Sequence, residues 1–251
     1  AISAELVGLS FSAEESKAFY VPVPGNYEEA LKVVQIFKPL YESDKIMKIG
    51  QNIKYDYEVL TRYGVTIQGK MFDTMIAHYL IQPELHHNMD YLAETLLGYQ
   101  TIHIEELLGP KGKKQKNMRD ISPTDIYEYA AEDADITLRL KNVLEPRLKE
   151  LGVEELFWNI EMPLVRVLAD MELNGVCLDT EALQDTSKIF NERMREYEQE
   201  IYKEAGEEFN ISSPKQVGDI LFGKLQIMDK PKKTKTGQYV TSEEVLQSLE
   251  N

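Results

Sequence analysis

The sequence has one cysteine and no long apolar run. Cys177 stands alone among 251 residues, which excludes an internal disulfide framework and is typical of a reducing compartment such as the cytoplasm. No apolar stretch approaches the roughly 18 residues of a membrane-spanning helix, so no membrane contact is expected. The first residues lack the basic and apolar regions of a signal peptide. The start at Ala1 instead of Met leads us to expect an excised fragment of a longer protein.

Positive charge is scarce, with 28 Lys and Arg against 43 Asp and Glu and a net charge of −15. This argues against a general nucleic-acid binder, because duplex binding depends largely on neutralising phosphates. A solubilising acidic surface is the plain alternative. Two basic clusters depart from the trend, in stretches whose Gly, Pro and Thr predict loops: Lys111, Lys113, Lys114, Lys116 and Arg119, and Lys230, Lys232, Lys233 and Lys235. Each cluster is either a local phosphate contact or a solvated loop.

Residues 1–150 alternate between strand and helix patterns, which predicts an α/β domain. The sequence predicts a hairpin of 6–11 and 18–23 across Ser12–Ser16, a strand at 46–49 and an extended segment at 65–72. Cap residues predict helices starting after Asn26, at 54, at 73, after Asn88 and after Ser122, the last running to about 151.

The pattern becomes helical after Gly152, so we expect domains at 1–150 and 151–251. Helices are predicted over 153–173, from 180 to about 205, after Ser213 and after Ser242. Apolar residues of the second of these recur at three-and-four spacing, which favours a buried stripe, although a partner-binding seam is the alternative: Leu183, Phe190, Met194, Tyr197 and Ile201.

Three residues suggest metal-dependent phosphodiester chemistry. Tyr129 and Asp133 lie four apart on a predicted helix and therefore share one face. Asp56 would approach from another helix. Two acids alone make a poor cage for a pair of ions, because two-metal catalysis needs several converging carboxylates. Other acids near these positions are expected to be helix-end or surface acids: Asp73, Asp90, Glu132 and Asp135. The four histidines show no zinc-ligand spacing.

Whole stretches of the sequence resemble the bacterial family-A DNA polymerases. Lys48–Asp56 resembles the second exonuclease motif of that family, and Tyr129–Asp135 resembles the third. Phe72–Met75, Met89–Ala93 and Asn159–Val165 are also similar to it. Asn174–Val176 and Phe209–Gln216 then resemble its thumb region, so the resemblance runs through nearly the whole chain in order.

The resemblance implies a ribonuclease-H-like 3'-5' exonuclease domain with a mixed sheet and flanking helices, followed by an all-helical thumb segment. In the parent enzyme it implies template-directed DNA synthesis with two-metal proofreading. Asp56 and Asp133 match metal ligands for Mg²⁺ or Mn²⁺, Tyr129 matches the water-orienting tyrosine, and Asn52 and Tyr55 match the single-strand channel. The implied partners are a single-stranded 3' end and, at the Lys230–Lys235 loop, primer–template duplex. A cytoplasmic monomer is expected.

The sequence also departs from that family. The first motif, an Asp-x-Glu, is expected just ahead of Leu6 and is absent there, so we expect the fragment alone to hold no metal. The palm carboxylates are expected beyond Asn251. His86 or His87 stands where an arginine is usual, and Ile104 where an aromatic is usual. A metal-free, exonuclease-like platform and a freestanding exonuclease acting on RNA are the alternatives.

Overall fold

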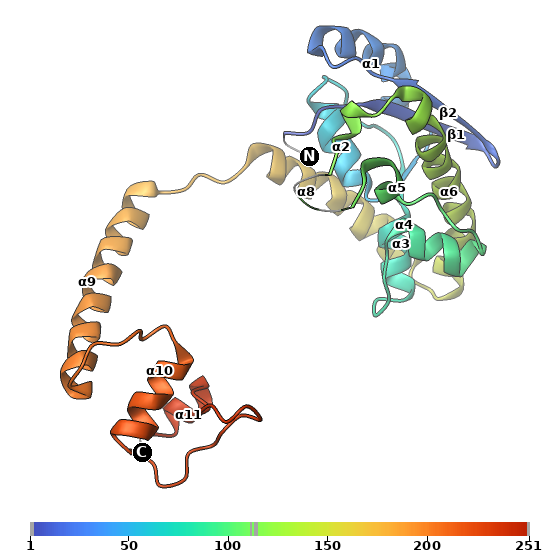
Figure 1. Cartoon of the computed structure of the whole chain (residues 1–251). Coiled ribbons are helices and arrows are strands. Elements are labelled where there is room, and N and C mark those ends of the chain that lie inside the picture. The colour runs from blue at the N-terminus through green and yellow to red at the C-terminus, as the bar shows by residue number, and fades with distance from the viewer. Residues whose placement is uncertain (1–2, 111, 113–114, 250–251) are drawn as a thin grey trace. The chain divides into compact units, whose positions relative to one another are not determined.

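A computed structural model describes residues 3–110, 112 and 115–249. The chain forms two compact units, Ala1–Val176 and Cys177–Asn251 (Figure 1). The first unit combines strands and helices, and the second is mostly helical, which confirms the predicted fold class. None of the helices in the described part of the chain is both long enough and apolar enough to cross a membrane.

The predicted hairpin forms from β1 (Gly8–Glu14) and β2 (Lys17–Pro22), which pair antiparallel. Its turn is tighter than the predicted Ser12–Ser16 loop, because pairing continues to Glu14 and Lys17 across a bulge. Ser16 closes the turn with a φ of 66°. The hairpin lies along one long helix, α6, as Figure 1 shows.

A second small sheet joins β3 (Lys48–Gly50) to β4 (Met71–Asp73) in parallel. The predicted extended segment at 65–72 therefore contributes only its end to a strand. Within the described residues the two pairs are separate sheets, β1–β2 and β3–β4, so the antiparallel and parallel pairings do not join. Each pair therefore has outer strand edges that no other described strand pairs with.

The helices mostly begin at the predicted caps. Asn26, Asn88, Ser122, Asp179 and Ser213 each accept a backbone N–H of the following turn. The helical segments are α1 (Tyr27–Tyr41), α2 (Ile53–Thr61), α3 (Thr74–Ile81), α4 (Met89–Leu92), η1 (Ala93–Leu97), α5 (Ile104–Leu108), η2 (Met118–Asp120), α6 (Pro123–Glu150), α7 (Glu154–Leu156), η3 (Phe157–Glu161), α8 (Met162–Asn174), α9 (Thr180–Ala205), α10 (Pro214–Gly218), η4 (Asp219–Lys224) and α11 (Glu243–Gln247).

The core of the first unit extends past residue 150. Phe72 of β4 packs on Phe157, with ring centroids 4.8 Å apart, and on Trp158, at 5.9 Å. Helix α8 packs on α2, and Arg166 donates to the carbonyl of Gly69 at 2.6 Å. The compact units therefore divide after Val176, later than the change of sequence pattern at 150/151, because this packing ties 151–176 to the α/β core.

The apolar stripe of α9 is exposed within its own unit, so the described residues after 176 do not bury it as the sequence predicted. Only Ala205 of this helix is buried. The stripe residues range from 39% exposed at Ile201 to 66% at Met194. Residue spacing could not reveal this, because an amphipathic pattern indicates an apolar helix face but not which segment packs against it.

Candidate functional site

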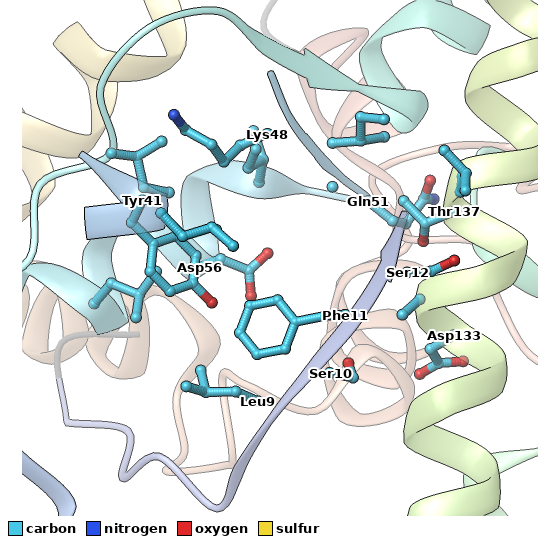
Figure 2. Close-up of a pocket in the computed structure, with 18 of the residues that line it drawn as sticks. Leu9, Ser10, Phe11, Ser12, Tyr41, Lys48, Gln51, Asp56, Asp133 and Thr137 are labelled. Carbon is cyan, nitrogen blue, oxygen red and sulfur yellow. The ribbon is translucent and has the colours of Figure 1, made fainter. Parts of the chain in front are cut away.

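A slot of about 650 Å³ separates the two small sheets (Figure 2). One wall is β1, including Ser10, Phe11 and Ser12, and another is β3 with the residues around it. Helix α2 contributes Asp56 and helix α6 contributes Asp133. The slot thus brings two of the three predicted catalytic residues to one cavity from segments far apart in the sequence.

Asp133 and Tyr129 interact as their spacing predicts. The Tyr129 hydroxyl donates a hydrogen bond to the Asp133 carboxylate one turn later along α6. Burial raises the pKa of Asp133 to about 7, nearby Glu132 and Asp90 add to the shift, and the Tyr129 hydrogen bond opposes it. Burial and these acids also raise the pKa of Tyr129, so its hydroxyl stays a proton donor at neutral pH.

Asp56 lies on α2 beside Tyr41, on the other side of Phe11 from Asp133 in the view of Figure 2. Asp56 is exposed to solvent and lines the slot, where neighbouring protein atoms lie around its carboxyl. Burial raises the pKa of Asp56 to about 7, and repulsion from Asp73 adds to the shift. A carboxyl placed there is partly protonated at neutral pH unless a cation stabilises its charge.

Asp73, expected to be a helix-end acid, is buried at 1% exposure and joins two helix starts. Its carboxylate accepts the backbone N–H groups of Met75 and Ile76 at the start of α3, at 2.9 and 3.2 Å. It also accepts those of Asn52 and Ile53 at the start of α2, at 3.2 and 2.8 Å. With four donors in place, Asp73 is a structural acid that fixes the helix carrying Asp56.

Asp90 and Glu132, expected to be surface acids, hold the segment 99–103. Glu132 accepts from the Tyr99 hydroxyl at 2.7 Å and from the Ile102 N–H at 2.8 Å. Asp90 accepts from Thr101 at 2.7 Å and pairs with His103 at 3.2 Å. Asp135 binds the β1–β2 turn. These acids bind donors of neighbouring segments and do not line the slot, whereas Asp56 and Asp133 do.

Asn52 and Tyr55, the predicted single-strand contacts, lie at the start of α2 and are both exposed. Asn52 has a φ of 63°, which directs the chain from β3 into the helix. Next to it, Gln51 lines the slot, donates to the carbonyl of His87 at 2.6 Å, and accepts from Thr74. The sequence reasoning missed this link, because Gln51 and His87 are joined only by the tertiary fold.

The histidines are closer than their sequence spacing indicated. Nδ1 of His78 lies 2.7 Å from Nδ1 of His87. His78 is 1% exposed, and its Nε2 lies 3.3 Å from Gln82. Within the part of the chain that the structure describes, no three His, Cys, Asp or Glu side chains gather in a way that would hold a metal.

The second basic loop forms a small hairpin in the second unit. Lys233 pairs with Tyr239 in an isolated bridge, and its Nζ lies 4.5 Å from the Tyr239 ring centroid. The N–H of Val240 donates to the carbonyl of Lys232 at 3.0 Å. The other cluster differs: Arg119 donates to the carbonyls of Val23 and Leu6 and is therefore structural. Lys111, Lys113 and Lys114 lie outside the described residues.

The donor chemistry of the slot suits a hard divalent ion, since carboxylate oxygens are what Mg²⁺ and Mn²⁺ prefer. Asp56 and Asp133 would hold such an ion. These two carboxylates from the described residues do not by themselves complete a cage for two ions. No catalytic step is therefore assigned to a metal held by these residues alone.

Comparisons with known proteins agree along the whole chain. The sequence model of the 3'-5' exonuclease family matches residues 1–149, and that of DNA polymerase family A matches residues 180–251. DNA polymerase I of Pseudomonas aeruginosa is 41% identical over 98% of this chain, and that of Rhizobium leguminosarum is 37% identical over 99%. The chain spans only 28% and 27% of their lengths.

A solved structure shares the fold. The polymerase domain of Pol1 from M. smegmatis, in complex with DNA primer–template and dNTP, superposes with a TM-score of 0.73 at 25% identity. The match covers 97% of this chain and 38% of the other. The first family model alone covers more than half of the chain, with Asp56, Tyr129 and Asp133 inside it. The chain therefore belongs to the 3'-5' exonuclease family, and it continues into sequence of DNA polymerase family A.

Proposed function

We propose that residues 1–149 are the proofreading 3'-5' exonuclease module of a family-A DNA polymerase that acts in replication and repair. The observation that carries this proposal is the slot: Asp56 and Asp133 line one cavity, and Tyr129 is hydrogen-bonded to Asp133 at its side. The substrate is a single-stranded DNA 3' end, with exposed Asn52 and Tyr55 as contacts. The division at 150/151 then separates this module from the polymerase sequence.

The residues have distinct roles in this proposal. Asp56 and Asp133 would hold Mg²⁺ or Mn²⁺ together with further carboxylates, and a bound ion would supply activation of water and stabilisation of charge on the phosphate. The protonated Tyr129 hydroxyl orients the attacking water. Asp73, which four backbone donors occupy, keeps the start of α2 and therefore Asp56 in place.

The slot suggests where the expected Asp-x-Glu motif would lie. The slot lies between β1 and β3, strands of two sheets that do not join within the described residues. An extended segment in the slot would pair with exposed strand edges and carry alternate side chains toward Asp56 and Asp133. We propose that the expected Asp-x-Glu strand of the longer protein occupies this slot.

Hydrolysis of a 3'-labelled single-stranded DNA tests the module, in a polypeptide that includes the expected Asp-x-Glu strand. Asp56→Ala and Asp133→Ala should each abolish hydrolysis, and Tyr129→Phe should reduce it less because one orienting hydrogen bond is lost. In a longer polypeptide that also includes the expected palm carboxylates, primer extension should survive all three changes. Glu128→Ala, at an exposed acid on the same helix, is the control. Full hydrolysis by Asp133→Ala protein would refute the assignment.

A second test uses the slot itself. The 251-residue chain alone should show neither hydrolysis nor primer extension. It should regain hydrolysis of single-stranded DNA in the presence of Mg²⁺ when a peptide carrying the Asp-x-Glu strand is added, and a peptide with both acids changed to amides should fail. Hydrolysis by the chain without any peptide would show that the two-carboxylate site suffices and that the slot needs no strand.

We also propose that residues 151–251 begin the polymerase part of the same enzyme, a cytoplasmic, nucleoid-associated monomer. Its basic hairpin would contact primer–template phosphates through Lys230, Lys232, Lys233 and Lys235. Lysines are flexible point charges, so this contact should not depend on base sequence. Lys233 is held over Tyr239, which limits the region of space that its charge can reach.

Affinity for duplex DNA measured against salt tests the hairpin in the longer protein. Changing Lys232, Lys233 and Lys235 together to Ala should weaken binding and flatten the slope of log K against log salt by up to about three, at roughly 0.9 per lysine. Processivity should fall while single-nucleotide turnover stays near normal. Lys188→Ala, on the exposed surface of α9, is the control. An unchanged slope would make the hairpin a solvated surface without a DNA role.

A further inference from the structure

Asp135 lies two residues after Asp133 and has a different environment. Its Oδ1 accepts the backbone N–H of Ser16 at 2.6 Å, and its Oδ2 pairs with Nη2 of Arg139 at 2.6 Å. Its side chain is only 13% exposed. A carboxylate with both oxygens engaged in short, charge-assisted contacts is fixed in place, so Asp135 is not the surface acid that the sequence indicated.

Two further residues of α6 bind the same turn. Nη2 of Arg139 also donates to Oγ of Ser16 at 2.9 Å, and Asn142 donates to Oε1 of Glu15 at 2.8 Å. Asp135, Arg139 and Asn142 are spaced by four and three residues and so share one helix face. The left-handed φ of Ser16 directs its N–H toward that face. We call Asp135, Arg139 and Asn142 the hairpin clamp.

The clamp acts on one wall of the slot. The β1–β2 pair has no third strand within the described residues, and an isolated two-stranded hairpin is marginally stable by itself. Its β1 strand forms the slot wall that faces α6, which also contributes Asp133 and Thr137 to the slot. Helix α6 therefore carries the candidate metal ligand Asp133 on one face. On the neighbouring face its side chains hold the β1–β2 turn.

We propose that Asp135 is a positioning residue, which holds the β1 wall of the slot at a set distance from Asp133. This proposal depends on the proposed function only for the catalytic role of the slot. Loss of the clamp should release the hairpin tip and change the width of the slot beside Asp133.

Amide hydrogen exchange of the 251-residue protein tests the mechanical part. Asp135→Ala should speed exchange over residues 8–22 by about tenfold or more, since it removes a charge-assisted contact at the tip. Asp135→Asn keeps an oxygen that can accept from Ser16 and should retain most of the protection. Glu145→Ala is the matched control, because it removes an i,i+4 ion pair with Lys141 on the same helix. Equal exchange in Asp135→Ala and Glu145→Ala proteins would overturn the proposal.

Nuclear Overhauser contacts between β1 and α6, measured by NMR in the 251-residue protein, test the positioning part. Asp135→Ala should weaken these contacts, because the hairpin tip is no longer fixed to the helix. Asp135→Asn, which keeps an oxygen for the Ser16 N–H, should retain most of them. Equal loss of the contacts in the two variants, or no loss in either, would overturn the positioning role.

These readouts require no nuclease activity. A failure of the exonuclease proposal would leave them unchanged, whereas a failure of the clamp would appear in amide exchange and in the β1–α6 contacts even if hydrolysis were confirmed. If Asp135→Ala protein does not fold, Asn142→Ala serves as the milder variant, because it removes only the contact to Glu15. It should then raise exchange at the turn more than Glu145→Ala does, and an exchange rate equal to that of the control would overturn the clamp.

Discussion

The two units of the chain bury their apolar residues very differently. In the first, Phe72 and Phe157 are fully buried and contact each other and Trp158. In the second, the long helix α9 buries only Ala205 and leaves Phe190 59% exposed. The contrast shows that the same amphipathic pattern can be satisfied by tertiary packing in one unit and remain open in the other. The first unit should therefore unfold cooperatively, while α9 depends on local interactions.

The largest expected effect comes from the core of the first unit. Phe157→Ala should lower the free energy of unfolding by about 3–5 kcal/mol, because it leaves a cavity beside Phe72. Phe190→Ala is the matched control in α9 and should cost less than about 0.5 kcal/mol. Urea unfolding followed by the fluorescence of Trp158, the one tryptophan, and by circular dichroism measures both. Similar costs for the two changes would remove the contrast between the units.

The second effect is the pH dependence of the first unit. Burial raises the pKa values of Asp56 and Asp133 from an ordinary 3.8 to about 7. Between these values the folded chain holds protons that the unfolded chain releases, so stability should fall as pH rises from about 4 to about 7 and stay low above. The double change to Asn should flatten this dependence in urea unfolding. An equal slope in the double variant would show that neither acid titrates as the structure implies.

A smaller effect should separate the second unit from the first. Asp179 accepts the N–H of Ala182 at 2.9 Å and caps α9. Asp179→Ala should weaken this helix by about 1 kcal/mol, which circular dichroism can detect as lost helicity. The Trp158 unfolding curve should not move, because that residue reports the first unit. A shift of that curve would indicate that the helix and the α/β core are energetically coupled.

The smallest effect is local to the His78–His87 pair. One Nδ1 must accept while the other donates, so a doubly protonated pair cannot keep the bond. Burial lowers the pKa of His78, with a Gln82 contact opposing it and the charges of His87 and Arg147 adding to it. The bond therefore contributes above the ordinary pKa of 6.5 and is lost as pH falls below it.

Amide exchange of residues 82–88, corrected for intrinsic rates, measures the opening of this pair. Exchange should rise about threefold to tenfold between pH 7 and pH 5, which corresponds to one hydrogen bond. His87→Ala should show the faster rate at both pH values. The His87 ring also contacts Tyr79, so Tyr79→Ala serves to separate ring packing from the hydrogen bond. A pH-independent rate in the unmodified chain would show that the His78–His87 hydrogen bond does not protect this segment.

The sequence predicted most of the helix starts and the pairing of residues one helical turn apart. Helix starts at Asn26, Ser122 and Asp179 follow from side chains that satisfy backbone N–H groups one turn away, which needs no distant partner. The pairing of Tyr129 with Asp133 follows from helix geometry alone. These predictions succeeded because their causes lie within a few residues of chain.

The tertiary structure decided which acids are structural and which are left for chemistry. Asp73, Glu132 and Asp135 looked like ordinary acids in the sequence, yet each is occupied by donors brought from elsewhere in the fold. Asp56 and Asp133, in contrast, line an open slot and carry raised pKa values. The sequence by itself determined the fold class, the helix starts and the family. Only packing could assign the partners, because hydrogen bonds that span 20, 30 and 119 residues depend on three-dimensional contacts that no local pattern encodes.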